Sequence, residues 1–124
     1  MKNEFVPYEQ ALQLKELGFD EPCLASYETA FGKGIDFELG YIIDGPKNYV
    51  LTPLYQQAFR WFRERYKLLG TPQYFTGGFY CYTINDMKDT KKSNRLFTEF
   101  PSYEEAELAC LIKLIEIIKK QRDE

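Results

Sequence analysis

The stretch that most constrains the fold is residues 52–69, TPLYQQAFRWFRERYKLL, where a start signal, a helical period and a charge pattern coincide. Thr52 can cap a helix, and Pro53 suits the first helical position because a missing N–H costs nothing there. At 100° per residue the large apolar side chains of this stretch fall on one stripe. The sequence therefore predicts a central helix whose aromatic side lies on the core. The stripe comprises Tyr55, Ala58, Phe59, Phe62, Tyr66 and Leu69, widened by Leu54, Trp61 and Leu68.

The opposite side of this predicted helix is polar and basic, and it is the first candidate binding surface. Its residues recur at spacings of four, three and four, so they share one stripe, and Arg65 lies at the edge of that stripe beside Trp61. A guanidinium in that position can stack on an aromatic ring or pair with a carboxylate. The alternative is a solvated face in which Arg60 pairs loosely with Glu64. The lysine-rich loop at residues 85–94 is the second part of the candidate surface. Together the candidate partner-binding residues are Gln56, Arg60, Arg63, Lys67, Arg65, Trp61, Lys88, Lys91 and Lys92. The sequence leaves open whether loop and helix share a side.

The rest of the chain predicts two further helices and four strands. Residues 7–17 form a helix that opens at Pro7 and ends at Gly18, with Phe19 folding back in a Schellman ending. Residues 24–31 and 35–43 form an antiparallel hairpin, since apolar residues alternate strictly from position 35. Residues 44–51 and 71–78 are rich in turn signals, and residues 79–84 and 95–100 are strands around a polar loop at 85–94. Residues 103–120 form a last helix, with a capping box made by Ser102 and Glu105.

This order, α-β-β-α-β-β-α, predicts an α+β fold in which three helices pack on a roughly four-stranded antiparallel sheet. At 124 residues, a single domain over residues 1–124 is expected. The helix at 103–120 is apolar over more than half its circumference, so it is either covered on both sides or forms a homodimer face.

Three blocks of the sequence carry a resemblance. They are FVPYEQALQLKELGFDEPC near the N-terminus, TPLYQQAFRWFRERYKL in the centre and PSYEEAELACLIKLIEIIK near the C-terminus. Together they resemble a recurring group of short hypothetical proteins encoded by phages and prophage-like regions of Bacteroidota, over about half of the chain. The resemblance implies a phage or mobile-element setting in a host cytoplasm, and it transfers no catalytic or binding residue.

Composition excludes several kinds of chemistry. The chain has no histidine, which removes the commonest general base, the usual metal ligand and every Ser-His or Cys-His arrangement. Its three cysteines, Cys23, Cys81 and Cys110, are widely spaced and odd in number, so we expect small core residues in a reducing compartment. The start of the chain has no signal-peptide pattern, and the most apolar run is too short to span a bilayer. We therefore expect a cytoplasmic protein with no membrane segment, cofactor, metal or catalytic residue.

Charge and aromatic content favour a binding function. The net charge is -3, but residues 51–100 hold eight basic and four acidic side chains. Aromatic residues make up 17% of the chain, and ten are tyrosines, which suit both the rim of a core and a recognition surface. The first hypothesis is a non-enzymatic phage-type accessory protein that binds a macromolecule, namely a host or phage protein. The alternatives are a nucleic-acid-binding protein using the basic helix face and a small-ligand-binding or sequestering protein.

Overall fold

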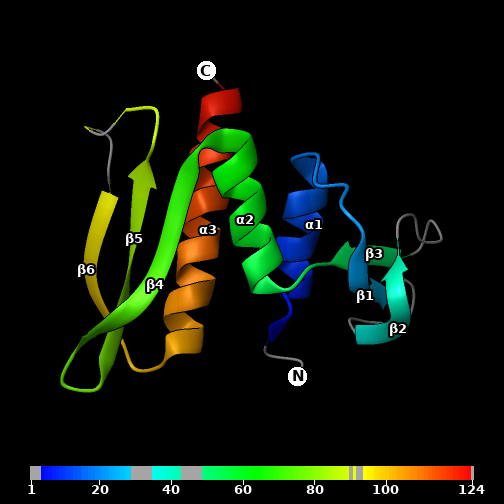
Figure 1. Ribbon diagram of the computed structural model, residues 1–124, viewed down its shortest axis with the longest axis horizontal. Coiled ribbons are helices and arrows are strands. Elements are labelled where there is room, and N and C mark those ends of the chain that lie inside the picture. The colour runs from blue at the N-terminus through cyan, green and yellow to red at the C-terminus, as the bar shows by residue number, and fades with distance from the viewer. Residues whose placement is uncertain (1–3, 29–34, 43–48, 90, 92–93, 124) are drawn as a thin grey trace. The chain divides into compact units, whose positions relative to one another are not determined.

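The structure is a computed structural model that describes residues 4–28, 35–42, 49–89, 91 and 94–123 (Figure 1). It divides into two compact units, unit 1 over residues 1–58 and unit 2 over residues 59–124. Each unit contains a three-stranded antiparallel sheet, with strand order β2-β1-β3 in unit 1 and β4-β5-β6 in unit 2. The elements are α1 (Tyr8–Glu16), β1 (Cys23–Glu28), β2 (Ile35–Ile42), β3 (Tyr49–Thr52), α2 (Tyr55–Tyr66), β4 (Leu68–Thr76), β5 (Phe79–Asp86), β6 (Asn94–Phe100) and α3 (Tyr103–Arg122).

The predicted class is confirmed, because the described residues form three helices and antiparallel strands in the expected alternation of helices and strand blocks. The division of the strands differs from the prediction. Instead of one sheet of about four strands, the described residues form two sheets of three strands each. β3 joins the predicted pair β1 and β2, and β4 joins the predicted pair β5 and β6. The prediction of a single domain concerns how the two units combine, and it stays a prediction.

Helix α1 ends where the sequence predicts. Gly18 has a positive φ of 100°, which glycine adopts without steric cost. The N–H of Phe19 donates to the carbonyl of Leu14 at 2.9 Å, and that of Gly18 donates to Lys15 at 3.0 Å. These two bonds are the Schellman pattern, and Phe19 is buried behind the last turn. The ending turns the chain toward β1.

The sheet of unit 1 is built on β1, which pairs with β2 on one side and β3 on the other. The first of these pairings is the predicted hairpin, while the glycine turn expected at residues 32–34 lies outside the described residues. Ala25 pairs with Thr52, and α1 lies against β3. Buried apolar side chains from α1, from the segment before it and from β1 and β3 form the core of this unit, namely Val6, Ala11, Leu14, Cys23, Ala25 and Val50.

Thr52 corrects the predicted start of the central helix. It lies in β3, is fully buried, and its hydroxyl donates to the carbonyl of Val6 at 2.6 Å. The hydroxyl of Tyr27 donates to the same carbonyl at 3.0 Å, and the N–H of Val6 donates to Pro53 at 3.0 Å. The polar side chain read as a helix cap thus ties β3 to the segment before α1, and α2 begins three residues later.

The end of the central helix also differs from the prediction. α2 stops at Tyr66, Lys67 adopts a left-handed conformation with φ 58°, and β4 begins at Leu68. The N–H of Met87 donates to the carbonyl of Lys67 at 2.8 Å, and Leu68 pairs with Asp86. The helix ends here because pairing with β5 captures the chain. Within residues 55–66 the predicted sidedness holds, because Phe62 is buried and Arg63 is exposed.

The segment predicted as turns, residues 71–78, is mostly strand. β4 pairs with β5 along its length, and only Gly77 and Gly78 form the reversal, with φ of 60° and 85°. Two consecutive residues with positive φ suit a tight hairpin whose twist matches the strands. β4 lies at one edge of the sheet, where Pro72, opposite Tyr82, is tolerated.

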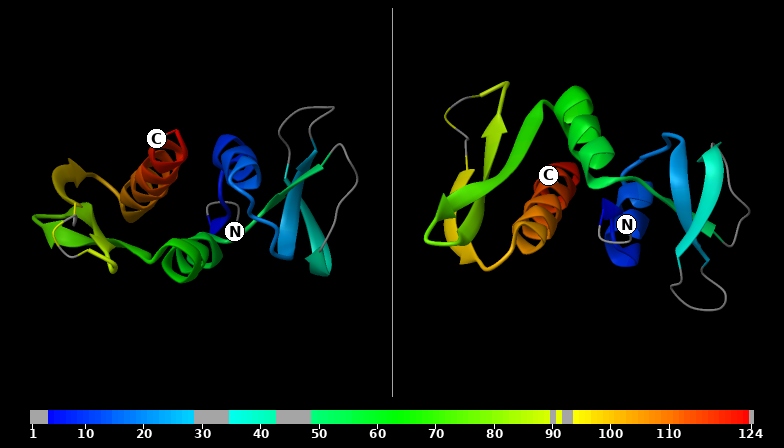
Figure 2. Two further views of the ribbon diagram at one scale, coloured as in Figure 1. Left: turned by 90° about the horizontal axis from the view of Figure 1, so that it is seen from above. Right: turned by 60° about the horizontal axis from the view of Figure 1, so that its bottom comes forward.

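Gly70 has a packing role in β4. A Cβ at this position would lie 2.9 Å from Sγ of Cys110 and 2.9 Å from Cδ1 of Leu114, both on α3. The absence of a side chain therefore lets β4 approach α3 closely. Figure 2 shows α3 lying along one face of the sheet of unit 2, and α3 contacts all three strands of that sheet. The core between them is apolar and includes Leu68, Tyr82, Ile84, Leu111, Leu114, Ile115 and Ile118.

The predicted start of α3 is confirmed. The side chain of Ser102 accepts a hydrogen bond from the N–H of Glu105 at 3.2 Å. Its hydroxyl lies 3.3 Å from a carboxylate oxygen of Glu105, to which it donates. Most apolar side chains of α3 are buried, while Ile112 is 37% exposed. The homodimer through this helix stays a prediction. None of the helices in the described ranges is long and apolar enough to cross a membrane.

Candidate functional site

Three segments far apart in sequence bring basic side chains to one end of unit 2. They are the last turn of α2 with Lys67, the loop after β5, and the last turn of α3, and Figure 1 shows all three at the end where α3 finishes. The bond between Met87 and Lys67 joins the loop directly to the end of α2. We call this the basic end, and its residues are Arg63, Arg65, Lys67, Lys88, Lys91, Lys119 and Lys120.

The contacts of α3 place its C-terminus at this end. Near its start, the ring of Tyr103 lies 6.0 Å from that of Tyr80. Further along α3, Glu116 is close enough to Tyr82 to help raise the pKa of its phenol, after the larger effect of burial. The helix therefore runs in the same direction as β5, and both elements end beside the loop that carries Lys88 and Lys91.

The loop is shaped by its own carboxylates. Oδ1 of Asp86 accepts the N–H of Lys88 at 2.9 Å and that of Asp89 at 3.3 Å. Oδ1 of Asp89 in turn accepts the N–H of Lys91 at 3.1 Å. Aspartates that bond backbone amides two or three residues ahead form such turns readily. The two acids are thus engaged with the backbone, and both lysines remain exposed.

Arg65 stands on a small aromatic cluster. Its guanidinium carbon lies 5.7 Å from the centre of the Trp61 ring and 5.8 Å from that of Tyr66. The two rings pack edge to face at 5.4 Å, and Trp61 is only 4% exposed. The buried ring of Trp61 therefore packs against the Arg65 guanidinium and is not accessible to a partner. The predicted juxtaposition of these two residues is confirmed, and the arginine is the exposed member.

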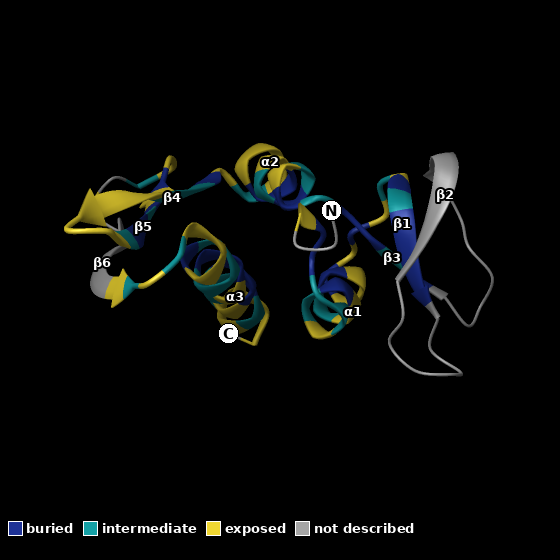
Figure 3. Ribbon diagram, turned by 90° about the horizontal axis from the view of Figure 1, so that it is seen from below, coloured by how far each residue is buried: buried dark blue, intermediate teal, exposed yellow. Residues whose placement is uncertain are grey.

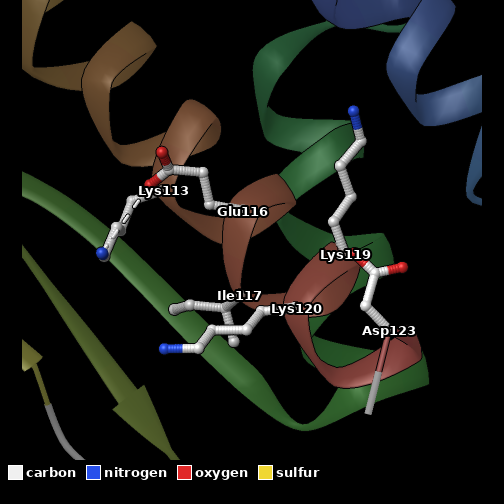
Figure 4. A pocket seen from close by; sticks show the side chains of 6 residues that line it. All are labelled: Lys113, Glu116, Ile117, Lys119, Lys120 and Asp123. Atoms are coloured by element: carbon white, nitrogen blue, oxygen red, sulfur yellow. Dashed lines mark ion pairs between the residues drawn. The ribbon is translucent and has the colours of Figure 1, made fainter.

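A hollow of about 580 Å³ lies along the second half of α3, beside the basic end. It is lined by Lys113, Glu116, Ile117, Lys119, Lys120 and Asp123. Figure 4 shows Lys113, Ile117 and Lys120 leaving the helix on one side and Lys119 on the other. The ammonium of Lys113 pairs with Glu116 at 3.7 Å, a contact between exposed groups. Three lysines and two acids line the hollow, so its lining carries a small positive excess, and Lys119 and Lys120 are the lysines outside the pair of Lys113 with Glu116.

A second surface lies at the other end of unit 2, where aromatic rings are exposed. Tyr74 is 59% exposed and accepts the N–H of Gly78 through its hydroxyl at 3.2 Å, so its ring is held over the hairpin turn. Tyr74 and Tyr80 pack edge to face at 5.7 Å, and Tyr80 packs in the same way on Tyr103. Figure 3 shows the tip of this hairpin in yellow, as exposed. We call this end of the unit the aromatic surface, and its residues are Tyr74, Phe75, Phe79, Tyr80 and Tyr103. Tyr74 and Tyr80 are cross-strand partners on one face of the sheet, whereas Phe79, next to Tyr80 in β5, is on the other face.

The predicted site residues separate into groups. Gln56 is exposed but belongs to unit 1, and Arg60 and Arg63 are exposed on the part of α2 in unit 2. Lys67 has left the helix, so it does not continue the stripe, but it meets the loop of Lys88 and Lys91 instead. Lys92 lies outside the described residues. Sequence reasoning missed Lys119 and Lys120 and the whole aromatic surface.

The three cysteines are buried and unpaired with one another, as expected of core residues. Burial raises the pKa of the Cys23 thiol to about 12, with a smaller effect of Glu21, and burial raises that of Cys110 to about 12. A thiol of this kind stays protonated near neutral pH, and the thiolate is the nucleophilic form. Cys23 and Cys110 are therefore poorly suited to nucleophilic catalysis.

We expect the folded protein to lose stability between about pH 9 and about pH 12 because of these two thiols. In the unfolded chain a cysteine ionises near pH 9, whereas the buried thiols hold their protons to about pH 12. Over that window the unfolded state binds fewer protons, so the free energy of unfolding falls as pH rises. Urea denaturation at several pH values measures the slope. The variant Cys23→Ala/Cys110→Ala should show a shallower slope, and an equal slope would contradict the assignment.

Among the residues that the structure describes, no group of three or more Cys, Asp or Glu side chains could hold a metal ion. In comparisons with protein-family models, with curated proteins and with solved structures, none matched this chain. The functional argument therefore rests on the two surfaces of unit 2.

Proposed function

We propose that this chain is a non-enzymatic accessory protein of a phage or prophage-like element and that it acts by binding a protein. The observation that carries the proposal is the aromatic surface. Large aromatic rings that stay exposed at one end of a small fold are typical of protein-recognition surfaces, where tyrosine and phenylalanine supply contact area at low entropic cost. The resemblance of three sequence blocks to short phage proteins supports the setting.

The geometry of the aromatic surface favours binding. Its rings are fixed before any partner arrives, since the edge-to-face contacts from Tyr74 through Tyr80 to Tyr103 span β4, β5 and α3. Rigid side chains lose little freedom on association, which leaves more of the contact energy for affinity. Phe75 and Phe79 are 38% and 39% exposed, so each can bury further apolar area against a partner.

The acidic side chains beside the aromatic surface indicate the charge of the partner's rim. Glu104 and Glu105 lie exposed in the first turn of α3, next to Tyr103. Burial, and after it the charge of Glu107, raises the pKa of the Tyr103 phenol, so the ring lies in a negative environment. A partner with an apolar centre and a basic rim is complementary to this surface.

The test is a quantitative binding comparison with a matched control. The full chain, immobilised, is used to capture partners from a host lysate, and the captured protein is then purified and titrated by calorimetry. Phe75→Ser/Phe79→Ser should weaken binding at least about tenfold, because aromatic anchors dominate such interfaces. Ile112→Ser removes an equally exposed apolar side chain of the same unit, 37% exposed, and should change affinity less than about twofold.

Thermal denaturation of each variant separates a binding effect from a folding effect. The three substituted side chains are 37–39% exposed, so each substitution also removes some packing, and affinities are compared only at temperatures where every variant remains folded. A captured protein that binds Phe75→Ser/Phe79→Ser as tightly as the original chain would rule out the aromatic surface. Failure to capture any saturable partner would remove the support for protein binding itself.

A further inference from the structure

We propose that the basic end of unit 2 binds single-stranded nucleic acid, with its lysines on phosphates and Arg65 stacked on a base. This inference goes beyond the proposed protein-binding function and uses the opposite end of the same unit. It depends on the convergence of three segments, on the aromatic support of Arg65 and on the lysine-lined hollow beside them.

The distribution of charge between the units supports an anionic ligand. Residues 1–58 contain four basic and nine acidic side chains, whereas residues 59–124 contain twelve basic and ten acidic ones. Within unit 2 the glutamates of the first turn of α3 lie at the aromatic end, and the basic last turns of α2 and α3 lie at the other. The net charge of -3 therefore conceals a local positive surface, and local potential is what attracts a polyanion.

Most cationic side chains of the basic end form no ion pair with the residues that the structure describes. Among the residues that the structure describes, six of them form no ion pair, namely Arg63, Lys67, Lys88, Lys91, Lys119 and Lys120. The same end also holds the carboxylates of Glu64, Asp86, Asp89 and Asp123, and Asp86 and Asp89 keep their negative charge while they accept backbone amides. The carboxylate of Glu116 pairs with Lys113. Cations at helix C-termini also stabilise the helix dipole, which explains part of this pattern. Lys88 and Lys91 lie in a loop, so the helix dipole does not account for their positions.

The arginine distinguishes nucleic acid from an acidic protein as the ligand. The guanidinium carbon of Arg65 lies 5.7 Å from the centre of the Trp61 ring and 5.8 Å from that of Tyr66, and the arginine side chain is exposed. A guanidinium plane held in this way can stack on an unpaired base, a mode common in recognition of single strands. A carboxylate of an acidic protein would bind the edge of the guanidinium and would not stack on its plane. Bases in a duplex are already stacked, so a single strand is the better fit.

The test uses fluorescence anisotropy with a labelled 15-nucleotide thymidine oligomer, titrated with the full chain at low salt. Binding should weaken steeply as salt rises, with the logarithm of the association constant falling by about 0.7 per phosphate contact for each unit of log salt. Lys88→Glu and Lys120→Glu should each lower affinity at least about fivefold and reduce the magnitude of the salt slope. Lys15→Glu makes the same charge change at an exposed position of α1 in unit 1, and it should change the affinity for the oligomer less than about twofold.

Arg65→Lys tests the stacking contact separately from charge. It keeps the positive charge and removes the planar group, so affinity should fall about tenfold while the salt slope stays unchanged. Phe75→Ser/Phe79→Ser at the aromatic surface should leave oligomer binding unchanged, which makes a failure here distinguishable from a failure of the protein-binding proposal. Circular dichroism of each variant checks that unit 2 remains folded.

Three results would overturn the inference. The first is no change in anisotropy up to high protein concentration at low salt. The second is polyglutamate of similar length competing as well as the oligomer, with Arg65→Lys behaving as the original chain, which would assign the end to an acidic protein. The third is thymidine monophosphate binding as tightly as the oligomer, which would assign the hollow on α3 to a small anion.

Discussion

Replacing Gly70 with valine is expected to lower the free energy of unfolding of unit 2 by about 2–3 kcal/mol, the upper range for overpacking a core. A Cβ alone would come within 2.9 Å of Cys110 and of Leu114, and both side chains are fully buried. Relief would require β4 to move away from α3, which would disturb the packing of the sheet on the helix. Urea denaturation followed by the fluorescence of Trp61, the single tryptophan and a residue of unit 2, measures the loss.

A double-mutant cycle shows whether the crowding has the stated cause. Cys110→Ala removes Sγ, so Gly70→Ala should cost less in that background than in the original chain, by at least about 0.5 kcal/mol. Gly78→Ala is the matched control: a Cβ there would have nothing within 4 Å, and its cost comes only from the positive φ of 85°. That cost should be the same in both backgrounds. Valine accepted at position 70 without loss of stability would contradict the close approach of β4 and α3.

The second large effect is expected from removing both hydroxyls that bond to the carbonyl of Val6. Thr52→Val and Tyr27→Phe should each cost about 1 kcal/mol, because the other hydroxyl still satisfies the acceptor. The double variant should cost about 3 kcal/mol, more than the sum, since a buried carbonyl then loses both side-chain donors. Chemical denaturation followed by circular dichroism, with hydrogen exchange of amides in unit 1, measures these losses.

The same experiment separates the two interpretations of Thr52. As a helix cap, Thr52 would contribute to α2 independently of Tyr27, and the two substitutions would add. As a strand residue bonded to Val6, it couples to Tyr27. Strict additivity of the two losses would therefore favour the cap that the sequence suggested.

Residues 52–69 show why the sequence predicted the type of each element better than its bounds. The apolar period was enough to identify α2 and its buried side, because that pattern depends on local spacing. The start signal at Thr52 was real, but it served a tertiary contact. Thr52 bonds to Val6, far away in sequence, and the helix ends at Tyr66 because the chain enters β4, which pairs with β5. Neither partner can be identified from the local pattern.

The candidate site shows the same division. That Arg65 would meet Trp61 followed from their spacing on a helix. That Lys67 would lie beside the lysine loop depended on the pairing of Leu68 with Asp86, which only the register of β4 and β5 determines. The aromatic surface could not be predicted either, since tyrosine is intermediate between typically buried and typically exposed residues. The high tyrosine content was its one visible signal.

Pro72 has a consequence for how other molecules can approach unit 2. A strand arriving alongside β4 would require an amide donor in the middle of that edge, and proline has none. Growth of the sheet from one copy to the next is therefore hindered at the β4 edge. A ligand that binds at the β4 edge must therefore contact side chains instead of extending the sheet.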